Sequence, residues 1–377
     1  MTKLKWFLNI VLVLIMVAGL LVTACAKEQE APKPAPAPAP KPAPAPAPKP
    51  APAPPKEDER AGWPKVASIA GTSVGSSKYA QASAFAIVMT RELGIPVSPE
   101  VFGGDSAAVA ISKKELEFSI GGDYYLNWSI LGTGVEAWKG QSLPIRGIAN
   151  VGLHVRGFVV NANSDIYTLA DVKGKRYCWP SYSQSANVLT DGWLASAGLT
   201  LDDVVARELT STKAGRAALI EGSVDIYCGV IGSPLAPNSS AMQMDQAIGV
   251  RQIAMTEEEA RALQEATKIF YVVKMPGGFL SGNPEPFWSV AGRWGIYTGS
   301  HLPDDFIYAV TKAFWENTED LGKMLVDYKE ANYTDRLANL PGILHAGAIK
   351  YYKEIGAWTP EMEKNNQYYL ELIGEEK

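Results

Sequence analysis

The stretch VASIAGTSVGSSKY, residues 66–79, joins an apolar strand to a helix through a loop of glycine and hydroxyl-bearing residues. Its first five residues predict the strand, and apolar side chains then recur at helical spacing from Ala82 to Leu93, where Gly94 ends the helix. The unit continues with a second strand at residues 97–102 and a short helix that begins after residues 103–106. A third strand, at residues 117–123, closes it. Strands that alternate with helices in this order are typical of parallel βαβ units.

The same order returns later in the chain around a second loop of small residues, at 180–185. A strand at 175–179 leads into this loop, and a helix at 186–197 leads out of it. The second unit closes with a strand, a helix and a strand, at residues 204–209, 213–221 and 224–229. In both units the opening and closing strands lie about fifty residues apart, as expected of a repeated supersecondary unit. Two unrelated α/β segments are the alternative, and the matching loops favour two like lobes.

The C-terminal part of the chain does not begin a third unit. It predicts a charged helix, a strand and three amphipathic helices, at residues 257–266, 287–297, 303–317, 317–328 and after Gly347. A chain that builds one lobe, then a second, and then returns must cross between them twice, near residues 154–160 and 284–290. We therefore expect an α/β fold of two lobes, each a mixed, mostly parallel sheet flanked by helices, with a ligand cleft at the hinge. Lobe 1 would comprise residues 63–157 and 286–377, and lobe 2 residues 158–285.

The N-terminal segment predicts export and membrane anchoring. Residues 1–24 combine a basic start with a short apolar run, which is how a secretory signal peptide is built. The run ends in small residues before Cys25, which resembles the lipobox of bacterial lipoproteins; ordinary cleavage with an incidental Cys25 is the alternative. Residues 25–62 are rich in Ala, Pro and Lys, which predicts a polyproline tether. A proline-rich ligand for a partner domain is the alternative there. We expect an extracytoplasmic lipoprotein, in the periplasm or at the cell surface.

Composition excludes several classes of function. A net charge of −5 with mixed signs provides no basic stripe, so nucleic acid is not an expected partner. The three histidines, His154, His301 and His345, lie in separate segments without metal-ligand spacing, so no metal is expected. Neither a P-loop, nor G-x-G-x-x-G, nor G-x-S-x-G occurs in the chain. We therefore expect neither a cofactor nor an enzyme, and we expect a monomer.

Both small-residue loops follow a strand and open a helix. Free backbone N–H groups and the helix dipole attract an anion at such a position. Hydroxyl and amide side chains add donors there, namely Thr72 and Ser73 in the first loop and Ser181, Ser183, Gln184 and Ser185 in the second. One such loop alone fits ordinary helix capping equally well. Two of them at equivalent positions, facing one cleft, favour a site for an anion.

A few other residues are candidates with two interpretations each. Asp123, with Tyr124 and Tyr125, follows a strand end and could reach the cleft. Trp179 and Trp288 belong either to a cleft wall or to the core. Cys178 and Cys228 lie on the first and third strands of lobe 2. If those strands are neighbours, the two cysteines could form a disulfide; buried free thiols are the alternative.

Several segments together resemble the TAXI family, the solute-receptor components of TRAP transporters. The resemblance covers about Val66 to Trp358 and includes the first loop through Tyr79, and Gly103 with Gly104. It continues in LADVKGKR, LIEGSVD, LPDDFIYAVTK and HAGAIKYY, at residues 169–176, 219–225, 302–312 and 345–352. The first of these four occurs in many type II binding proteins, whereas the last two together are more specific.

This resemblance implies a periplasmic binding protein of type II that hands a small carboxylate, such as glutamate or 2-oxoglutarate, to a TRAP membrane permease. It implies ligand contacts from lobe 1 by Thr72, Ser73 and Tyr79. It implies contacts from lobe 2 by Ser183, Gln184 and Ser185, with Asp123 and Ser233 nearby. Further candidates for ligand contact are Val74, Gly104, Trp179 and Ser181.

The chain departs from the family at the second loop, where bulky Trp179 and Tyr182 stand. An aromatic carboxylate is therefore a further candidate ligand. A substrate-binding lipoprotein of an ABC importer, or a sensor receptor of the same architecture, is the alternative function.

Overall fold

The computed structural model describes residues 60–375 except 136–137, 182 and 333–339. The predicted signal peptide, the lipidation site Cys25, most of the tether and Tyr182 lie outside the described residues. Within the described part of the chain, no helix combines the length and the apolar character needed to cross a membrane.

One mixed sheet of eleven strands organises the described residues, in the order β2-β1-β3-β11-β4-β7-β5-β6, with β10 beside β11, β8 beside β7 and β9 beside β4. The strands are β1 Ala67–Gly71, β2 Val97–Val101, β3 Phe118–Gly122, β4 Ile145–Asn161, β5 Arg176–Trp179, β6 Val205–Glu208, β7 Ile226–Ser233, β8 Ala236–Pro237, β9 Val250–Gln252, β10 Tyr271–Met275 and β11 Phe287–Gly299.

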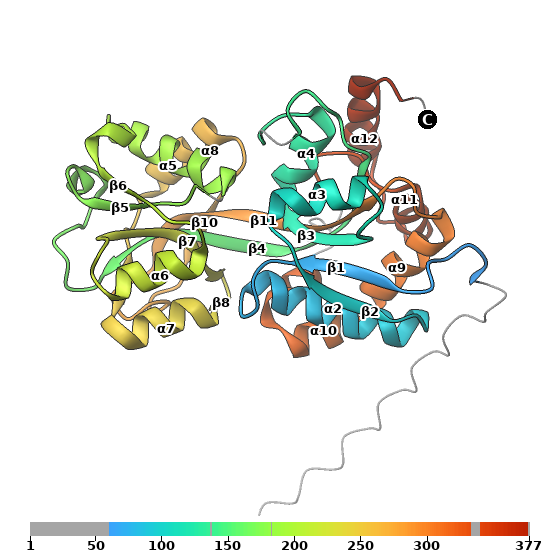
Figure 1. Ribbon diagram of the computed structural model, residues 1–377, viewed down its shortest axis with the longest axis horizontal. Coiled ribbons are helices and arrows are strands. Elements are labelled where there is room, and N and C mark those ends of the chain that lie inside the picture. The colour runs from blue at the N-terminus through green and yellow to red at the C-terminus, as the bar shows by residue number, and fades with distance from the viewer. Residues whose placement is uncertain (1–59, 136–137, 182, 333–339, 376–377) are drawn as a thin grey trace, which may run out of the picture. The chain divides into compact units, whose positions relative to one another are not determined.

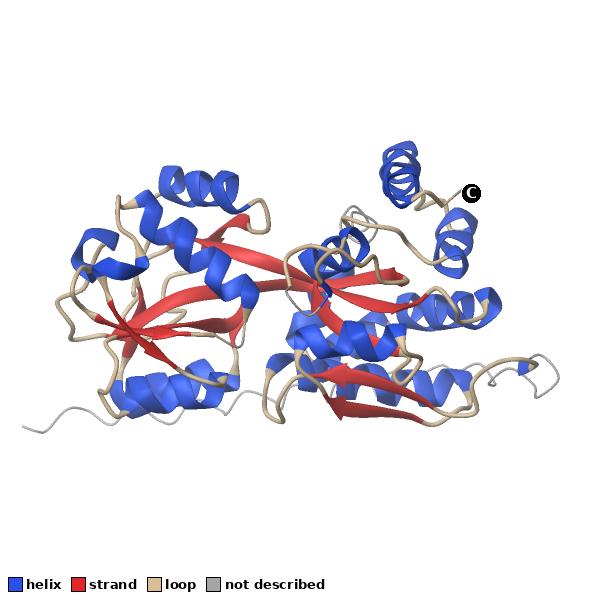
Figure 2. Ribbon diagram, turned by 45° about the horizontal axis from the view of Figure 1, so that its top comes forward, coloured by secondary structure: helices blue, strands red, loops and turns tan. Residues whose placement is uncertain are grey.

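Helices flank the strands on both sides (Figure 2). They are α2 Ser77–Leu93, α3 Gly104–Ser112, α4 Asp123–Leu131, α5 Gln184–Ser196, α6 Thr212–Ile220, α7 Ser239–Ile248, α8 Glu257–Thr267, α9 Asp304–Glu316, α10 Thr318–Met324, α11 Ala346–Glu354 and α12 Pro360–Ile373. This arrangement confirms the predicted α/β class, a mixed sheet with flanking helices.

The two predicted repeat units form the two ends of the sheet. β1 pairs in parallel with β2 and β3, and β5 pairs in parallel with β6 and β7. Figure 1 shows β5 to β7 with α5 to α8 at one end, and β1 to β3 with α2 to α4 at the other. The repeated strand–loop–helix pattern therefore predicts the strand neighbours in both units.

The long strands β4 and β11 connect the two ends (Figure 1). β4 pairs antiparallel with β11 up to His154 and with β7 from Val155 onward. β11 pairs with β10 up to Ala291 and with β4 from Gly292 onward. Both crossing strands thus change partners at the same level, and this level is a hinge candidate. The sequence placed the second crossing at 284–290, a few residues earlier than this change.

The sequence patterns did not predict helix α4. The predicted third strand ran to Asp123, but β3 ends at Gly122 and Asp123 opens the helix. Six of the nine residues of α4 are buried, among them Asp123, Tyr124 and Tyr125. A helix buried on most of its surface has no apolar stripe for periodicity to detect.

The buried apolar side chains of the described residues form three clusters. One surrounds β1 and β3 and includes Phe85 and Phe314. The other two lie on either side of β5 and β7, and in one of them the rings of Phe158 and Trp193 stack at 3.6 Å. Each end of the sheet therefore has its own apolar packing, joined through β4 and β11.

Candidate functional site

The first small-residue loop is held by its own cap. Ser76 precedes α2, and its hydroxyl accepts a hydrogen bond from the backbone N–H of Tyr79 at 3.2 Å. The Thr72 and Ser76 hydroxyls lie 2.8 Å apart. A Cβ on Gly71 would lie only 2.7 Å from the Tyr79 Cα, so glycine lets the helix begin directly against the strand end.

The second loop is built in the same way. Ser183 precedes α5, and its hydroxyl accepts from the backbone N–H of Ala186 at 3.4 Å. The Ser183 and Ser185 hydroxyls lie 3.3 Å apart, and Ser185 is almost fully buried. Capping thus fixes the hydroxyls of both loops at the start of a helix.

These two loops line one cleft of about 330 Å³, as predicted from their equivalent positions. The first loop contributes Thr72, Ser73, Ser76 and Ser77, and the second contributes Ser183 and Ser185. The N-cap residues of five helices, α2, α3, α5, α6 and α7, lie on the cleft wall; they are Ser76, Gly103, Ser183, Ser211 and Asn238. Five positive dipole ends therefore meet around one space.

Three cations also line the cleft, and each comes from a different element. Lys78 is on α2, Arg156 on β4 and Arg216 on α6. An Arg156 Nη2 atom donates to the Ser185 hydroxyl at 3.4 Å. The lining residues include no aspartate and no glutamate. The described lining is therefore positively charged.

Lys78 sits among aromatic rings. Its ammonium lies 5.6 Å from the centre of the Trp294 ring and 5.8 Å from that of Tyr125, within cation–π range. Burial lowers the pKa of Lys78 to about 8, and the charge of Arg156 acts in the same direction while Asp105 opposes it. An anion beside this ammonium would offset that shift.

His154 is a buried polar residue that packs against the Trp294 ring. The His154 ring stacks on Trp294 at 4.5 Å, and neither of its ring nitrogens has a hydrogen-bond partner among the described residues. Burial, and then the charges of Arg156 and Lys78, hold the pKa of His154 well below its usual range. His154 is therefore a neutral, structural ring at the level where β4 changes partner.

Four of the predicted site residues line the cleft: Thr72, Ser73, Ser183 and Ser185. The other predicted ligand contacts from the two loops are not on its wall. Val74 is 73% exposed at a loop tip, Ser181 and Gln184 are exposed, and Tyr79 contributes its backbone to the Ser76 cap. Gly104 stands one residue behind the lining Gly103.

Trp179, Asp123 and Ser233 lie elsewhere too. Trp179 packs against the core beside β5, which is the alternative left open for it. The carboxylate of Asp123 accepts a hydrogen bond from the Tyr271 hydroxyl at 2.8 Å, and burial raises its pKa to about 6 against the opposing effects of Arg293 and this hydrogen bond. The buried Ser233 hydroxyl accepts from the backbone N–H of Leu235.

Tyr124 and Tyr125, expected with Asp123 to reach the cleft, are on its wall, whereas Asp123 is not. The sequence did not assign the three cations or Trp294 to the site. Lys78 lies within the opening stretch itself, two residues after the Ser76 cap. Arg156 is a charged residue in the otherwise apolar strand that was predicted to cross between the lobes. A charge on a crossing strand is a usable signal, because a buried charge needs a partner.

The two cysteines of lobe 2 are buried free thiols on the neighbouring strands β5 and β7. Burial raises the pKa of the Cys178 thiol to about 12, and it also raises the pKa of Cys228. Of the two alternatives left by the sequence, the structure has the free thiols and not the disulfide.

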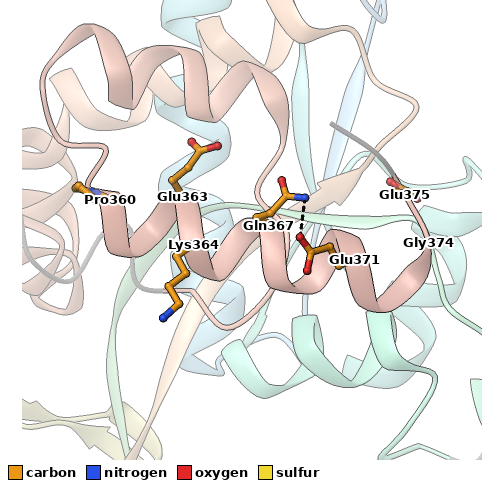
Figure 3. Close-up of a pocket in the computed structure, with 7 residues that line it drawn as sticks. All are labelled: Pro360, Glu363, Lys364, Gln367, Glu371, Gly374 and Glu375. Carbon is orange, nitrogen blue, oxygen red and sulfur yellow. Dashed lines mark hydrogen bonds between the residues drawn. The ribbon is translucent and has the colours of Figure 1, made fainter.

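A second depression, of about 740 Å³, runs along α12 (Figure 3). Its lining comes from α12 and the two residues that follow it, with Gln367 donating to Glu371 at 3.2 Å. Unlike the cleft, this depression has a single wall and does not bring together side chains from different elements. We therefore place the candidate site in the cleft, where several elements converge.

Comparison with known proteins gives one family and a set of similar structures. A family model described as the NMT1-like family matches residues 69–356. The periplasmic sulfonate-binding protein SsuA of a putative sulfonate ABC transporter from Methylobacillus flagellatus KT is 16% identical, with a TM-score of 0.43 over 82% of this chain and 95% of that one.

Two further structures are similar to the same extent. The periplasmic aliphatic sulphonate binding protein SsuA from Escherichia coli is 15% identical, with a TM-score of 0.42 over 82% of this chain and 87% of that one. PhnD1 from Prochlorococcus marinus (MIT 9301), in complex with methylphosphonate, is 13% identical, with a TM-score of 0.47 over 78% of this chain and 99% of that one.

Proposed function

This chain belongs to the NMT1-like family, and on that premise we propose that it is an extracytoplasmic solute-binding protein that captures a small organic anion between two lobes. The observation that supports this most directly is the composition of the cleft wall. Five helix N-caps and three cations line one space, and no acidic side chain of the described residues does. Backbone dipoles and fixed positive charges in a recessed site stabilise a bound anion.

Closure of the two lobes completes the proposed mechanism. Residues 63–157 with 286–377 would move as lobe 1, and residues 158–285 as lobe 2, about the level where β4 and β11 change partners. Across the cleft mouth, the Ser239 hydroxyl lies 3.5 Å from the Gly75 carbonyl oxygen, a long and exposed hydrogen bond. A weak contact of this kind suits an opening that a ligand must pass.

The anion is proposed to be a carboxylate such as glutamate, 2-oxoglutarate or a related acid, delivered to a membrane permease by a receptor anchored at Cys25. The import system has two candidates. The resemblance noted in the sequence implies a TAXI-type TRAP transporter, and an ABC importer, or a sensor receptor with the same fold, is the alternative. The similar structure from Methylobacillus flagellatus KT is named for a putative sulfonate ABC transporter.

Calorimetric titration of the purified chain tests the binding function. The panel is dicarboxylates, aromatic acids, sulfonates, phosphonates and neutral sugars. We expect at least one organic anion to bind, and Lys78→Gln to weaken it tenfold or more, since a hydrogen bond to a charged group contributes about 1.5–3 kcal/mol. Arg207→Gln, at an exposed position on β6, is the matched control and should leave affinity unchanged. Binding of sugars but of no anion would contradict the proposal.

Uptake into membrane vesicles separates the two import systems. The identified solute and the purified chain are supplied with either ATP or an ion gradient alone. Uptake that requires ATP identifies an ABC importer, and uptake driven by the gradient without ATP identifies a TRAP permease. Binding without uptake under either condition favours the sensor.

A further inference from the structure

The cleft has two centres of positive charge. Lys78 and Arg156 form the first: Lys78 lies 5.6 Å from the centre of the Trp294 ring, His154 stacks on that ring, and Arg156 follows His154 two residues along β4. Arg216 is the second: it lies on α6 of lobe 2, one turn after Thr212. Among the described residues neither Lys78 nor Arg216 has a salt bridge or a hydrogen bond from its charged group.

No acidic group faces either centre from the cleft wall. The carboxylate that acts most strongly on Lys78 is Asp105, which is not a lining residue. The Tyr125 hydroxyl donates a hydrogen bond to Asp105 and so lowers the pKa of its carboxyl, but burial has the larger effect and raises this pKa overall. A ligand ammonium in the cleft would therefore meet three cations and no carboxylate on the wall.

An independent observation points to a ligand near the second centre. Ser240, in the first turn of α7, lines the cleft and is only 7% exposed. Its hydroxyl has no hydrogen-bond partner among the described residues. The hydroxyl oxygen itself is not sealed from the cleft that the residue lines, so it is available to a bound molecule. Helices α6 and α7 pack against each other, which places Ser240 and Arg216 on the same side of the cleft.

We infer that the cleft selects a solute with two separate acidic groups and no ammonium group, and that Arg216 and Ser240 bind the second acidic group. This deepens the proposed function and rests on it: among the acids named there, it favours 2-oxoglutarate over glutamate. One acidic group takes the place beside Lys78 and Arg156, and the other takes the place at the N-terminus of α6. A dianion neutralises both centres, whereas an α-amino acid brings a positive charge that finds no counter-ion on the described wall.

Titration with matched compounds tests this selection. The probes are the four- to six-carbon dicarboxylates succinate, glutarate and adipate, their α-amino analogues aspartate, glutamate and 2-aminoadipate, and the monomethyl esters of the three dicarboxylates. We expect one dicarboxylate to bind at least tenfold more tightly than both its amino analogue and its monoester. Arg216→Gln should weaken that dicarboxylate about tenfold and change the affinity of its monoester less than twofold.

Two controls separate the inference from its premise. Arg216→Lys should restore part of the dicarboxylate affinity, and the exposed Arg207→Gln should change nothing. An amino acid that binds as tightly as its ammonium-free analogue overturns the inference and leaves the proposed function standing. Equal weakening of dicarboxylate and monoester by Arg216→Gln overturns the role given to Arg216. Failure of every anion in this panel and the wider one overturns the proposed function itself.

Discussion

At the scale of single residues, Lys78 connects the charge of the cleft to solution pH. Its ammonium lies between two aromatic rings, and its pKa is lowered to about 8 chiefly by burial. The side chain is therefore charged at neutral pH and loses its proton within an accessible range. An anion favours the charged form, so the pKa of Lys78 must rise when the anion binds.

We predict that affinity for the anion is constant below about pH 7 and falls as pH rises through the pKa of Lys78, about 8. Above that value, binding requires uptake of a proton. Calorimetry from pH 6.5 to 9.5 in two buffers of different ionisation enthalpy measures both effects. Lys78→Arg keeps the charge and should remove the pH dependence. An unchanged decline in this variant would show that another group titrates.

Asp123 is the second residue whose titration has a measurable effect. The residue is 2% exposed, and the folded-state pKa of its carboxyl is about 6, above the ordinary value of 3.8. The folded state therefore binds more protons than the unfolded state between these values, and this group makes stability fall as pH rises from about 4 to 6.

We predict that Asp123→Asn gains stability relative to the wild type by up to about 3 kcal/mol between pH 4 and pH 7, since one pKa unit corresponds to about 1.36 kcal/mol. Denaturant unfolding at several pH values measures this difference. Tyr271→Phe is the matched control: it keeps the carboxyl and removes the donor that lowers its pKa, so the pH dependence should persist and move upward. A difference between Asp123→Asn and wild type that is the same at all pH values would contradict the prediction.

At the scale of elements, the junction of β1 and α2 depends on the absence of one side chain. Gly71 ends the strand, and Tyr79 lies in the first turn of the helix. A Cβ at position 71 would meet the Tyr79 backbone Cα at 2.7 Å, a contact that no rotamer change relieves. The helix would have to move, and its cap and cleft hydroxyls would move with it.

We predict that Gly71→Ala lowers the free energy of unfolding by about 1–3 kcal/mol, the usual effect of overpacking. It should also weaken ligand binding, because Thr72 and Ser76 are displaced. Gly103→Ala is the control, since a Cβ there meets only the Ser106 hydroxyl at 3.4 Å. Denaturant titration compares the two variants, and equal stability in both would contradict the steric argument.

Local sequence predicts the elements and loops of the cleft but not all of its chemistry. Strand and helix periods, with the serine caps, are encoded within a few residues, so β1, α2, β5 and α5 were found. Arg156 and Trp294 reach the cleft from β4 and β11, whose register joins Trp294 to Gly152 across more than a hundred residues. Single-residue patterns do not encode such pairings, so Trp294 could not be assigned to the site in advance, whereas the charge of Arg156 on the crossing strand was a local signal for it.

At the scale of the whole described molecule, binding and hinge are linked through the same strands. Arg156 lies two residues beyond the last β4 residue on the β11 side of the change, and Trp294 lies three residues beyond the last β11 residue that pairs with β10. A ligand held by these residues would contact the proposed hinge. Its binding energy would then act directly on the angle between the two proposed lobes.

We predict that a saturating anion decreases the radius of gyration of the purified chain in small-angle X-ray scattering. Lys78→Gln should require a higher ligand concentration for the same decrease, because it weakens binding without altering the hinge. An unchanged radius at saturation, with binding confirmed by calorimetry, would show that capture occurs without closure.

The path of the chain through the sheet also orders its assembly. β11 is the neighbour of both β3 and β4, so the strands β1 to β3 have no hydrogen-bonded link to β4 until β11 arrives. β3 ends at Gly122 and β11 begins at Phe287, so the residues between them must be made first. During synthesis from the N-terminus, we therefore expect β5 to β9 to have their strand neighbours, β4 included, before β11 is made. β11 is then added last, beside β3, β4 and β10.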